Sequence, residues 1–141
     1  MLGPSAHVDT FARDRLPPPD EWPDLLLDSF DYPEHLNAGV ELSDAMVRKG
    51  FGDHTALIGN GRRRTYKELT DWSNRIAHAL VEDFGIRPGN RILIRSANNP
   101  AMVACWLAAT KVGAVLVNTM PMLRSVELTK IVDKAEVSLA L

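Results

Sequence analysis

The chain has 141 residues, of which 45% are hydrophobic and 24% charged, as in an ordinary globular domain and unlike a disordered or fibrous chain. Sixteen basic and eighteen acidic residues give a net charge of −2, which removes the general electrostatic case for nucleic acid or an anionic membrane as a partner. One cysteine excludes an internal disulfide framework, and the start of the chain lacks an apolar signal-like segment, so we expect a cytoplasmic protein.

Residues 1–36 are predicted to form an extended N-terminal arm. Pro17-Pro18-Pro19 and Pro23 prevent a long helix and leave room for one helical turn over residues 8–15. Large apolar side chains recur through the arm: Phe11, Leu16, Trp22, Leu25–Leu27, Phe30 and Tyr32. We therefore expect the arm to lie along the surface of the body, with a contact to another protein as the alternative.

Residues 37–141 are predicted to form an incomplete α/β subdomain that begins with a helix and a hairpin. Asn37 can cap a helix that runs to about Lys49. Residues 55–66 predict a β-hairpin, because the Asn-Gly pair at residues 60–61 is the strongest short signal for a tight hairpin turn.

A longer helix follows the hairpin. Thr65 and Glu68 have the spacing of a capping box, in which each side chain bonds the backbone N–H of the other residue. Apolar residues then recur every three or four positions and predict one buried stripe: Leu69, Trp72, Ile76, Leu80 and Phe84. The helix is expected to reach about Asp83 and to end before Gly85.

Residues 90–119 predict the strand–helix–strand unit around which the chain is organised. The apolar run at residues 92–94 is typical of a strand covered on both faces, as in a parallel sheet. Asn99 and Pro100 mark the start of the helix and Gly113 its end. This helix is apolar nearly all round but too short to cross a membrane, so it is interpreted as a core helix beside two parallel strands.

The last part of the chain predicts another helix, which starts at Ser125, and a third strand over residues 136–141. A strand that needs cover on both faces is a poor place for a domain to stop, so we expect the natural protein to continue beyond residue 141. The predicted fold class is α/β, a partial layered sheet with flanking helices.

The residue types that usually carry chemistry are present but do not form a site. The four histidines lack metal-site spacing and are interpreted as surface or helix residues: His7, His35, His54 and His78. Cys105 lies among apolar neighbours and is interpreted as an inert buried thiol, while Trp72 and Trp106 are interpreted as packing residues. The arm aspartates mark no acid–base pair: Asp9, Asp14, Asp20, Asp24 and Asp28. We therefore assign no catalytic, cofactor-binding or metal-binding residue.

Two further patterns could indicate binding of nucleic acid or of phosphate. Arg62–Arg64 form a basic cluster that is compatible with nucleic acid, but in a net acidic chain such a cluster is more often a solvated strand face. The glycine-rich residues 59–61 lead into a strand and not into a helix N-terminus, which argues against a phosphate loop.

Three stretches, taken together and in order, resemble the adenylate-forming superfamily of acyl- and aryl-CoA ligases. They are Arg64–Leu69, Trp106–Thr119, and Glu127-Leu128 with residues 131–141. The arm segment at residues 5–14 is similar to the N-terminal segment of 2-aminobenzoate–CoA ligases in the benzoate–CoA ligase group. Other stretches similar to that group are Leu16-Pro17-Pro18, Trp22-Pro23, Asn98-Asn99-Pro100, Ala104-Cys105-Trp106 and residues 120–124.

The resemblance implies an enzyme that joins an aromatic carboxylate to ATP as an acyl-adenylate and then transfers the acyl group to coenzyme A, with Mg²⁺. It also implies that the phosphate loop, the nucleotide-contacting segments and the C-terminal domain with its lysine lie beyond Leu141. The chain alone is then expected to bind none of these cofactors tightly and to be catalytically silent.

Two alternatives to the ligase interpretation stay open. The first is a free-standing α/β binding or interaction module without catalysis. The second is a regulatory fragment that pairs with a full-length ligase, or with itself, through its exposed last strand.

Overall fold

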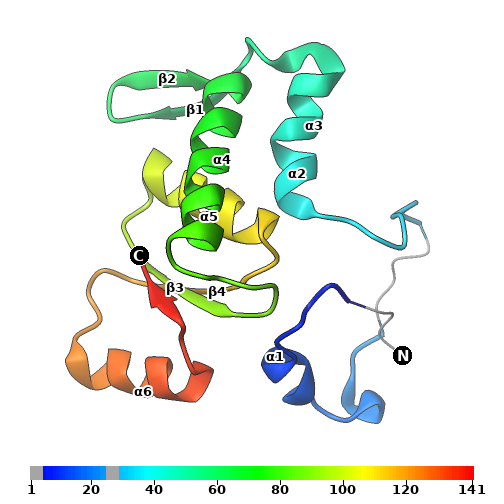
Figure 1. Cartoon of the computed structure of the whole chain (residues 1–141), viewed down its shortest axis with the longest axis vertical. Helices are drawn as coiled ribbons and strands as arrows, with labels where there is room; N and C mark the ends of the chain where they lie inside the picture. The colour runs from blue at the N-terminus through cyan, green and yellow to red at the C-terminus, as the bar shows by residue number, and fades with distance from the viewer. Residues whose placement is uncertain (1–4, 25–28) are drawn as a thin grey trace.

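The computed structural model describes residues 5–24 and 29–141 of the chain (Figure 1). Over this part of the chain the elements are, in order, α1 (Phe11–Asp14), η1 (Pro19–Glu21), α2 (Ala38–Leu42), α3 (Asp44–Met46), η2 (Val47–Phe51), β1 (Thr55–Gly59), β2 (Arg62–Thr65), α4 (Tyr66–Glu82), β3 (Arg91–Arg95), α5 (Pro100–Lys111), β4 (Val115–Thr119), α6 (Ser125–Ala135) and β5 (Leu139–Ala140).

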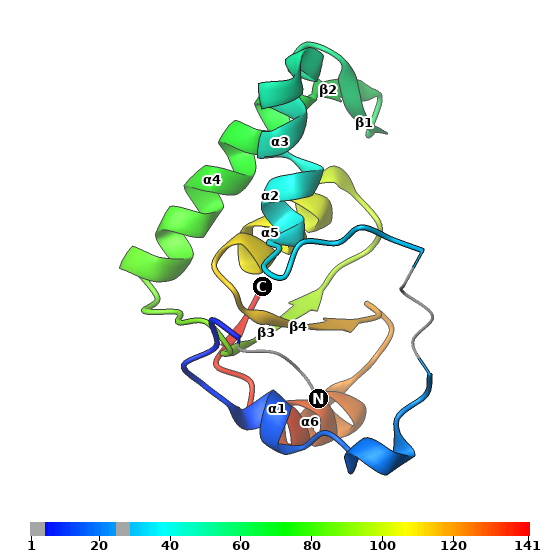
Figure 2. The ribbon, with the colours of Figure 1, turned by 90° about the vertical axis from the view of Figure 1, so that its right-hand side faces the viewer.

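A parallel three-stranded sheet of order β4-β3-β5 lies at the centre of the fold. In its register Arg91 pairs with Val115 and Ile92 pairs with Leu139. Helices α4 and α5 lie on one side of the sheet and α6 lies on the other, as two perpendicular views show (Figures 1 and 2). The predicted α/β class and the parallel strand–helix–strand unit are therefore confirmed.

The core forms where the central strand meets α4 and α5. Ile92 and Ile94 are buried in one cluster with Leu80 of α4 and with Ile86, which follows that helix. Leu93 lies between the two isoleucines and points to the opposite face, and it is also buried. The strand is covered on both faces, as its continuous apolar run predicts.

Local signals correctly placed the limits of α4, with one error near its end. The Thr65 hydroxyl accepts from the N–H of Glu68 at 3.2 Å, and the Glu68 carboxylate accepts from the N–H of Thr65 at 2.8 Å, which completes the capping box. The prediction that Phe84 continues the buried stripe is wrong, because its side chain is 58% exposed. The helix ends at Glu82, and Phe84 leaves the helical spacing on the way to Gly85, where φ is +64°.

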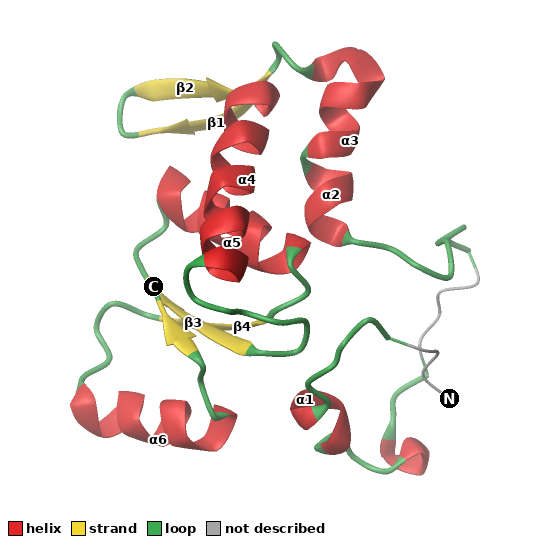
Figure 3. Cartoon of the chain, viewed as in Figure 1, coloured by secondary structure: helices red, strands yellow, loops and turns green. Residues whose placement is uncertain are grey.

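The helix predicted from Asn37 to Lys49 is interrupted. Asn37 does cap it, by accepting from the N–H of Val40 at 3.2 Å, but the helix breaks at Ser43, where φ is −130° and ψ is −72°. The Ser43 hydroxyl donates to the carbonyl of Gly39 at 2.6 Å and so competes with regular helical bonding. The result is the separate α2 and α3 (Figure 3).

The predicted strand at residues 136–141 is shorter in the structure. Only Leu139 and Ala140 form β5, because Glu136 adopts a left-handed conformation, with φ of +46°, that ends α6. None of the residues of α6 is fully buried. Leu128 and Ile131 are half-buried, so this helix packs on its face of the sheet less deeply than α4 and α5 pack on theirs.

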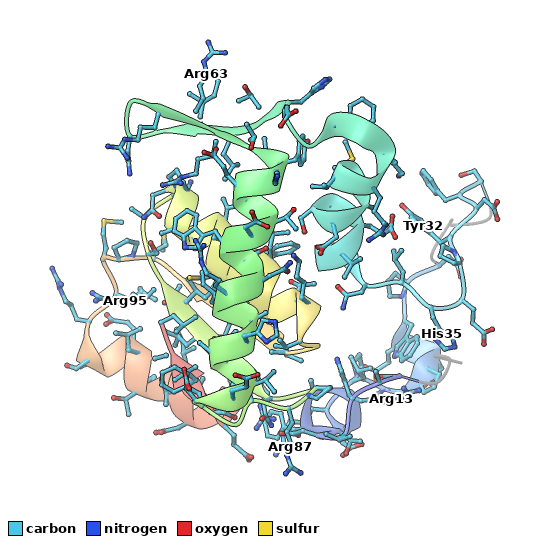
Figure 4. All side chains as sticks on the ribbon, turned by 45° about the horizontal axis from the view of Figure 1, so that its top comes forward. Arg13, Tyr32, His35, Arg63, Arg87 and Arg95 are labelled. Carbon is cyan, nitrogen blue, oxygen red and sulfur yellow. The ribbon has the colours of Figure 1, made fainter. Side chains whose placement is uncertain are left out.

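The hairpin between β1 and β2 is confirmed. Asn60 and Gly61 form its turn with φ of +52° and +71°, the conformation that Asn-Gly favours in a two-residue turn. Arg62 and Arg63 are exposed, and Arg63 projects away from the body (Figure 4). The interpretation of Arg62–Arg64 as solvated residues therefore holds for these two, which point to opposite faces of the strand, whereas Arg64 is half-buried beside Trp72.

The arm follows the body only in part. Residues 5–16 hydrogen-bond to the turn before β3 and contain the predicted helical turn, so the expected surface path is confirmed for this segment. Phe30 and Tyr32 instead stack on each other, with ring centroids 5.6 Å apart, and are 57% and 60% exposed. Leu25–Leu27, which the sequence analysis counted among the apolar arm residues, lie outside the described residues.

We predict that Leu80→Ala lowers the free energy of unfolding by about 2–5 kcal/mol, because it leaves a cavity in the core beneath α4. The matched control is Val81→Ala, the next residue of the same helix, whose side chain is 49% exposed. Urea unfolding followed by circular dichroism measures both. Equal losses in the two variants would contradict this assignment of the core.

Candidate functional site

The carboxyl ends of β3 and β4 are the first place in this fold to look for a ligand site. The chain leaves β3 toward α5 on one side of the sheet and leaves the neighbouring β4 toward α6 on the other side (Figure 2). Where neighbouring strand connections diverge in this way, an open α/β sheet forms a crevice outside its carboxyl edge. Such crevices are the usual ligand sites of this architecture.

A hollow of about 500 Å³, here called the carboxyl-edge hollow, occupies this position. Its lining comes from the segment after β3, from α5 and from the end of β4 and its following loop: Ser96, Ala97, Asn98, Met102, Asn118, Thr119, Met120, Pro121 and Met122. Met120 and Met122 are 58% and 75% exposed, which is unusual for large apolar side chains. The hollow therefore combines adaptable thioether side chains with neutral amide and hydroxyl groups.

Arg95, at the end of β3, holds the loop that forms one wall of the hollow. Its Nη2 donates to the carbonyl oxygens of Pro121 at 2.6 Å and of Leu123 at 3.1 Å. Figure 4 shows this arginine beside the loop that precedes α6. The central strand thus fixes the shape of the carboxyl-edge hollow through one side chain.

A second hollow, of about 420 Å³, adjoins the first and shares Asn98 and Met102 with it. It lies between the tip of the hairpin and the start of α5. Gly59 of β1 approaches Pro100 so closely that a Cβ at this glycine would lie 2.7 Å from the proline Cγ. This contact sets the hairpin against α5 and joins the two hollows along one side of the body.

The lining of the carboxyl-edge hollow limits its chemistry. The lining residues include no lysine, arginine, histidine or carboxylate, so they offer no group for proton transfer, for neutralising a phosphate or for binding Mg²⁺. The residues of this hollow do not fit ATP with its metal ion. They can contact an apolar or neutral group, and no catalytic step is derived through them.

A buried ion pair lies on the other side of α5, where α3, α4 and α5 meet. Lys111 Nζ lies 2.6 Å from the Asp44 carboxylate, and it also donates to Ser73 Oγ at 2.9 Å and to Asn74 Oδ1 at 2.6 Å. Burial raises the pKa of the Asp44 carboxyl, but hydrogen bonds from Lys111 and Ser43 outweigh this effect, so the pKa lies below its ordinary value. All three donors of the ammonium group are used within the fold, which gives this pair a structural role.

The four histidines do not converge on one site. His7 and His35 both line an open hollow of about 600 Å³ beside the start of α2. His54 packs edge-on against a phenylalanine ring, and His78 lies 3.5 Å from Glu82 on the exposed side of α4. Within residues 5–24 and 29–141, no three His, Cys, Asp or Glu side chains are placed to hold one metal ion.

The tryptophans lie where they were predicted, whereas Cys105 is half-buried and not fully buried as interpreted from the sequence. Cys105 packs against the core, and burial raises the pKa of its thiol, which makes it a weaker nucleophile at neutral pH. Trp72 and Trp106 pack against the core clusters, and the Arg64 guanidinium lies 4.6 Å from the Trp72 ring centre. The interpretation of both tryptophans as packing residues is confirmed.

The aspartates of the arm have separate environments. Asp9 contacts an arginine at the start of β3, and Asp14 accepts a hydrogen bond from a threonine of the arm. Asp20 and Asp24 are exposed, and Asp28 lies outside the described residues.

The sequence analysis missed the charged residues that hold the layers together. Arg91 and Arg95 flank the apolar core of β3, and a charge that is buried, as that of Arg91 is, needs a partner. The partners themselves, such as Asp9 for Arg91 and Asp44 for Lys111, come from distant segments. Nothing in their spacing along the chain identifies them.

Residues 45–141 match the family described as AMP-binding enzyme, and the chain belongs to this family. It is 35% identical over 82 residues to a 3-hydroxybenzoate–CoA ligase of Aromatoleum sp. (strain CIB), which covers 58% of this chain and 16% of the relative. It is also 35% identical over 94 residues to a crotonobetaine/carnitine–CoA ligase of Salmonella paratyphi A, covering 63% and 18%. The chain therefore spans about one sixth of the length of these curated relatives.

Two solved structures have a similar fold. The N-terminal subdomain of Klebsiella oxytoca NpsA is 25% identical, with a TM-score of 0.64 over 72% of this chain and 26% of that one. The anthranilate CoA ligase AuaEII, in complex with anthranoyl-AMP, has a TM-score of 0.71 over 78% of this chain and 21% of that one. Its identity is 21%, so this likeness establishes the fold alone.

Within the described residues, no helix is long and apolar enough to cross a membrane.

We predict that Asp44→Asn lowers the free energy of unfolding at pH 7 by about 3 kcal/mol, because it leaves the buried Lys111 charge without its counter-ion. The folded state lowers the pKa of Asp44, so the stabilisation is complete above the unfolded pKa, near 4, and is lost as pH falls through the folded pKa. Urea unfolding at pH 7 and at pH 3 measures the difference between variant and parent, which should shrink at pH 3. The control Asp71→Asn removes an exposed carboxylate of α4 and should show a small effect at both pH values.

Proposed function

We propose that this chain is the N-terminal part of an ATP-dependent, AMP-forming aromatic acid–CoA ligase, with 2-aminobenzoate as the acid. Residues 1–36 form its arm and residues 37–141 an incomplete α/β subdomain of the AMP-binding domain. The observation that carries the proposal is the family match over residues 45–141, together with a relative named for 3-hydroxybenzoate. Solved structures of similar fold include an anthranilate CoA ligase and a benzoate CoA ligase of Burkholderia xenovorans LB400, whose names agree with the proposed aromatic class.

In the proposed reaction, a carboxylate oxygen of the acid bonds to the α-phosphorus of ATP and pyrophosphate leaves. The thiol of coenzyme A then loses its proton, bonds to the acyl carbon and displaces AMP. The first step brings two anions together, so it depends on positioning and on charge neutralisation by N–H groups, cations and Mg²⁺. Because the carboxyl-edge hollow has no charged lining residue, this chain supplies scaffold, and ATP, Mg²⁺ and coenzyme A bind to residues outside it.

The same proposal places the enzyme in the cytoplasm, with a small aromatic carboxylate as substrate and with neither nucleic acid nor membrane as partner. Self-association through the exposed edge of β5 is also proposed, since this strand pairs only with β3 among the described residues. Light scattering after size-exclusion chromatography tests the last point: a monomer at all concentrations would overturn it.

We predict that the full-length native polypeptide catalyses pyrophosphate exchange and CoA thioester formation with 2-aminobenzoate, and that purified 1–141 catalyses neither. A panel of 2-aminobenzoate, benzoate, 3-hydroxybenzoate and crotonobetaine, assayed by mass spectrometry of the thioester, tests the substrate. Turnover of crotonobetaine alone would overturn the aromatic assignment. Acid-dependent exchange by purified 1–141 would overturn the scaffold role.

The intact mass of the native polypeptide in its source cells provides the independent control. A mass several times 15.6 kDa is the expected result. A native mass near that of this chain would overturn the ligase proposal and favour a binding module.

A further inference from the structure

The arm meets the body at the amino end of the parallel sheet. The N–H groups of Val8 and Asp9 both donate to the carbonyl oxygen of Pro88, at 3.1 Å each. The Asp9 carboxylate accepts from the N–H of Phe11 at 3.1 Å and from the amide of Asn90 at 2.9 Å. Residues 5–16 are thus fixed to the turn that leads into β3.

Arg91 joins this segment to α6. Its guanidinium is buried and contacts the Asp9 carboxylate on one side. On the other side it donates to the carbonyl oxygens of Ala135 at 2.8 Å and Glu136 at 2.9 Å, where α6 ends. A cation at this position is also favoured by the helix dipole. One side chain therefore connects the arm, the central strand and the last turn of α6.

Phe11 completes the contact. The Arg91 guanidinium lies 4.2 Å from its ring centre, and the Arg15 guanidinium lies 3.6 Å from it on the arm side. Arg15 also reaches Glu136 at 3.5 Å. Figure 1 accordingly shows α1 near the C-terminal end of α6.

Helix α6 is packed less deeply than α4 and α5: Leu128 and Ile131 are half-buried. None of its residues is fully buried, and Val126 is 67% exposed. At its other end, Arg95 holds the loop at residues 120–123 by two carbonyl oxygens. The central strand thus contacts the end of α6 through Arg91 and the loop before α6 through Arg95. The two arginines point to the same face of the sheet because they are four residues apart in a strand.

We propose that residues 5–16 form a clasp that locks α6 onto the sheet through Arg91, and that this clasp positions the loop at residues 120–124 at the carboxyl-edge hollow. Asp9 and Arg91 are then positioning residues. The clasp lies outside the family match, which begins at residue 45, and the proposal rests on the observed contacts and not on the ligase reaction. Loss of the clasp removes Asp9 and Phe11 from the Arg91 guanidinium and so weakens its contacts with the end of α6, and both the helix and the loop should then open more often.

Gly89 offers a way to displace the arm without touching α6. Its φ is +93°, and a Cβ there would overlap the carbonyl oxygen of Asp9. Gly85 is the matched control, because its φ is +64° but a Cβ would meet nothing within 4 Å. The two Gly→Ala variants share the backbone penalty of a positive φ, and only one of them collides with the clasp.

The test is hydrogen–deuterium exchange with mass spectrometry on the full chain. In Gly89→Ala, amides of residues 5–16, of α6 and of the loop at 120–124 should exchange at least about tenfold faster than in Gly85→Ala, while α4 and α5 stay protected in both. Asp9→Asn should give the same pattern, and its control Asp14→Asn, which removes a charge from the arm away from Arg91, should not.

Two results would overturn the proposal. In one, Gly89→Ala releases residues 5–16 but leaves exchange in α6 equal to that of Gly85→Ala, which would show that the arm does not stabilise α6. In the other, residues 5–16 exchange as in the control, so that the arm is not held at Gly89. If exchange in α4 and α5 also rises in Gly89→Ala, the comparison of α6 exchange between Asp9→Asn and Asp14→Asn tests the proposal instead, since Asp9→Asn leaves the backbone unchanged.

Discussion

The buried guanidinium of Arg91 is the interaction on which the arrangement of this chain depends. A buried cation is costly unless its donors find acceptors. Here the acceptors are the carbonyls of Gly89, Ala135 and Glu136 and the carboxylate of Asp9. They come from the arm, from the turn before β3 and from the end of α6, so satisfying one charge brings three segments together.

The pKa of Asp9 follows from the same contacts. The N–H of Phe11 lowers it most, Arg91 and Asn90 lower it further, and burial acts against them, so the pKa lies below its ordinary value. The Lys111–Asp44 pair is another charge pair that joins separate elements. Lys111, at the end of α5, contacts Asp44 of α3 and Ser73 and Asn74 of α4. Apolar packing thus builds the layer of α4 and α5, whereas the arm and α6 combine shallower apolar packing with these polar contacts.

The positions of the charged residues bear on the function of the carboxyl-edge hollow. The carboxyl edge of the sheet is where an α/β fold usually binds its ligand, yet the lining of that hollow is uncharged. Two arginines of the central strand act instead within the scaffold, Arg91 at the end of α6 and Arg95 at the loop before it. Membership in the AMP-binding family gives this scaffold a context.

The sequence alone determined the elements whose signals are local. The Thr65–Glu68 capping box, the turn at residues 60–61 and the parallel unit around β3 were predicted correctly, because each depends on neighbours a few positions away or on hydrophobic periodicity. The tertiary structure alone decided the carboxyl-edge hollow and the partners of Arg91. Asp9 and Arg91 are 82 positions apart, and only the folded chain brings a buried charge to its counter-ion across such a separation.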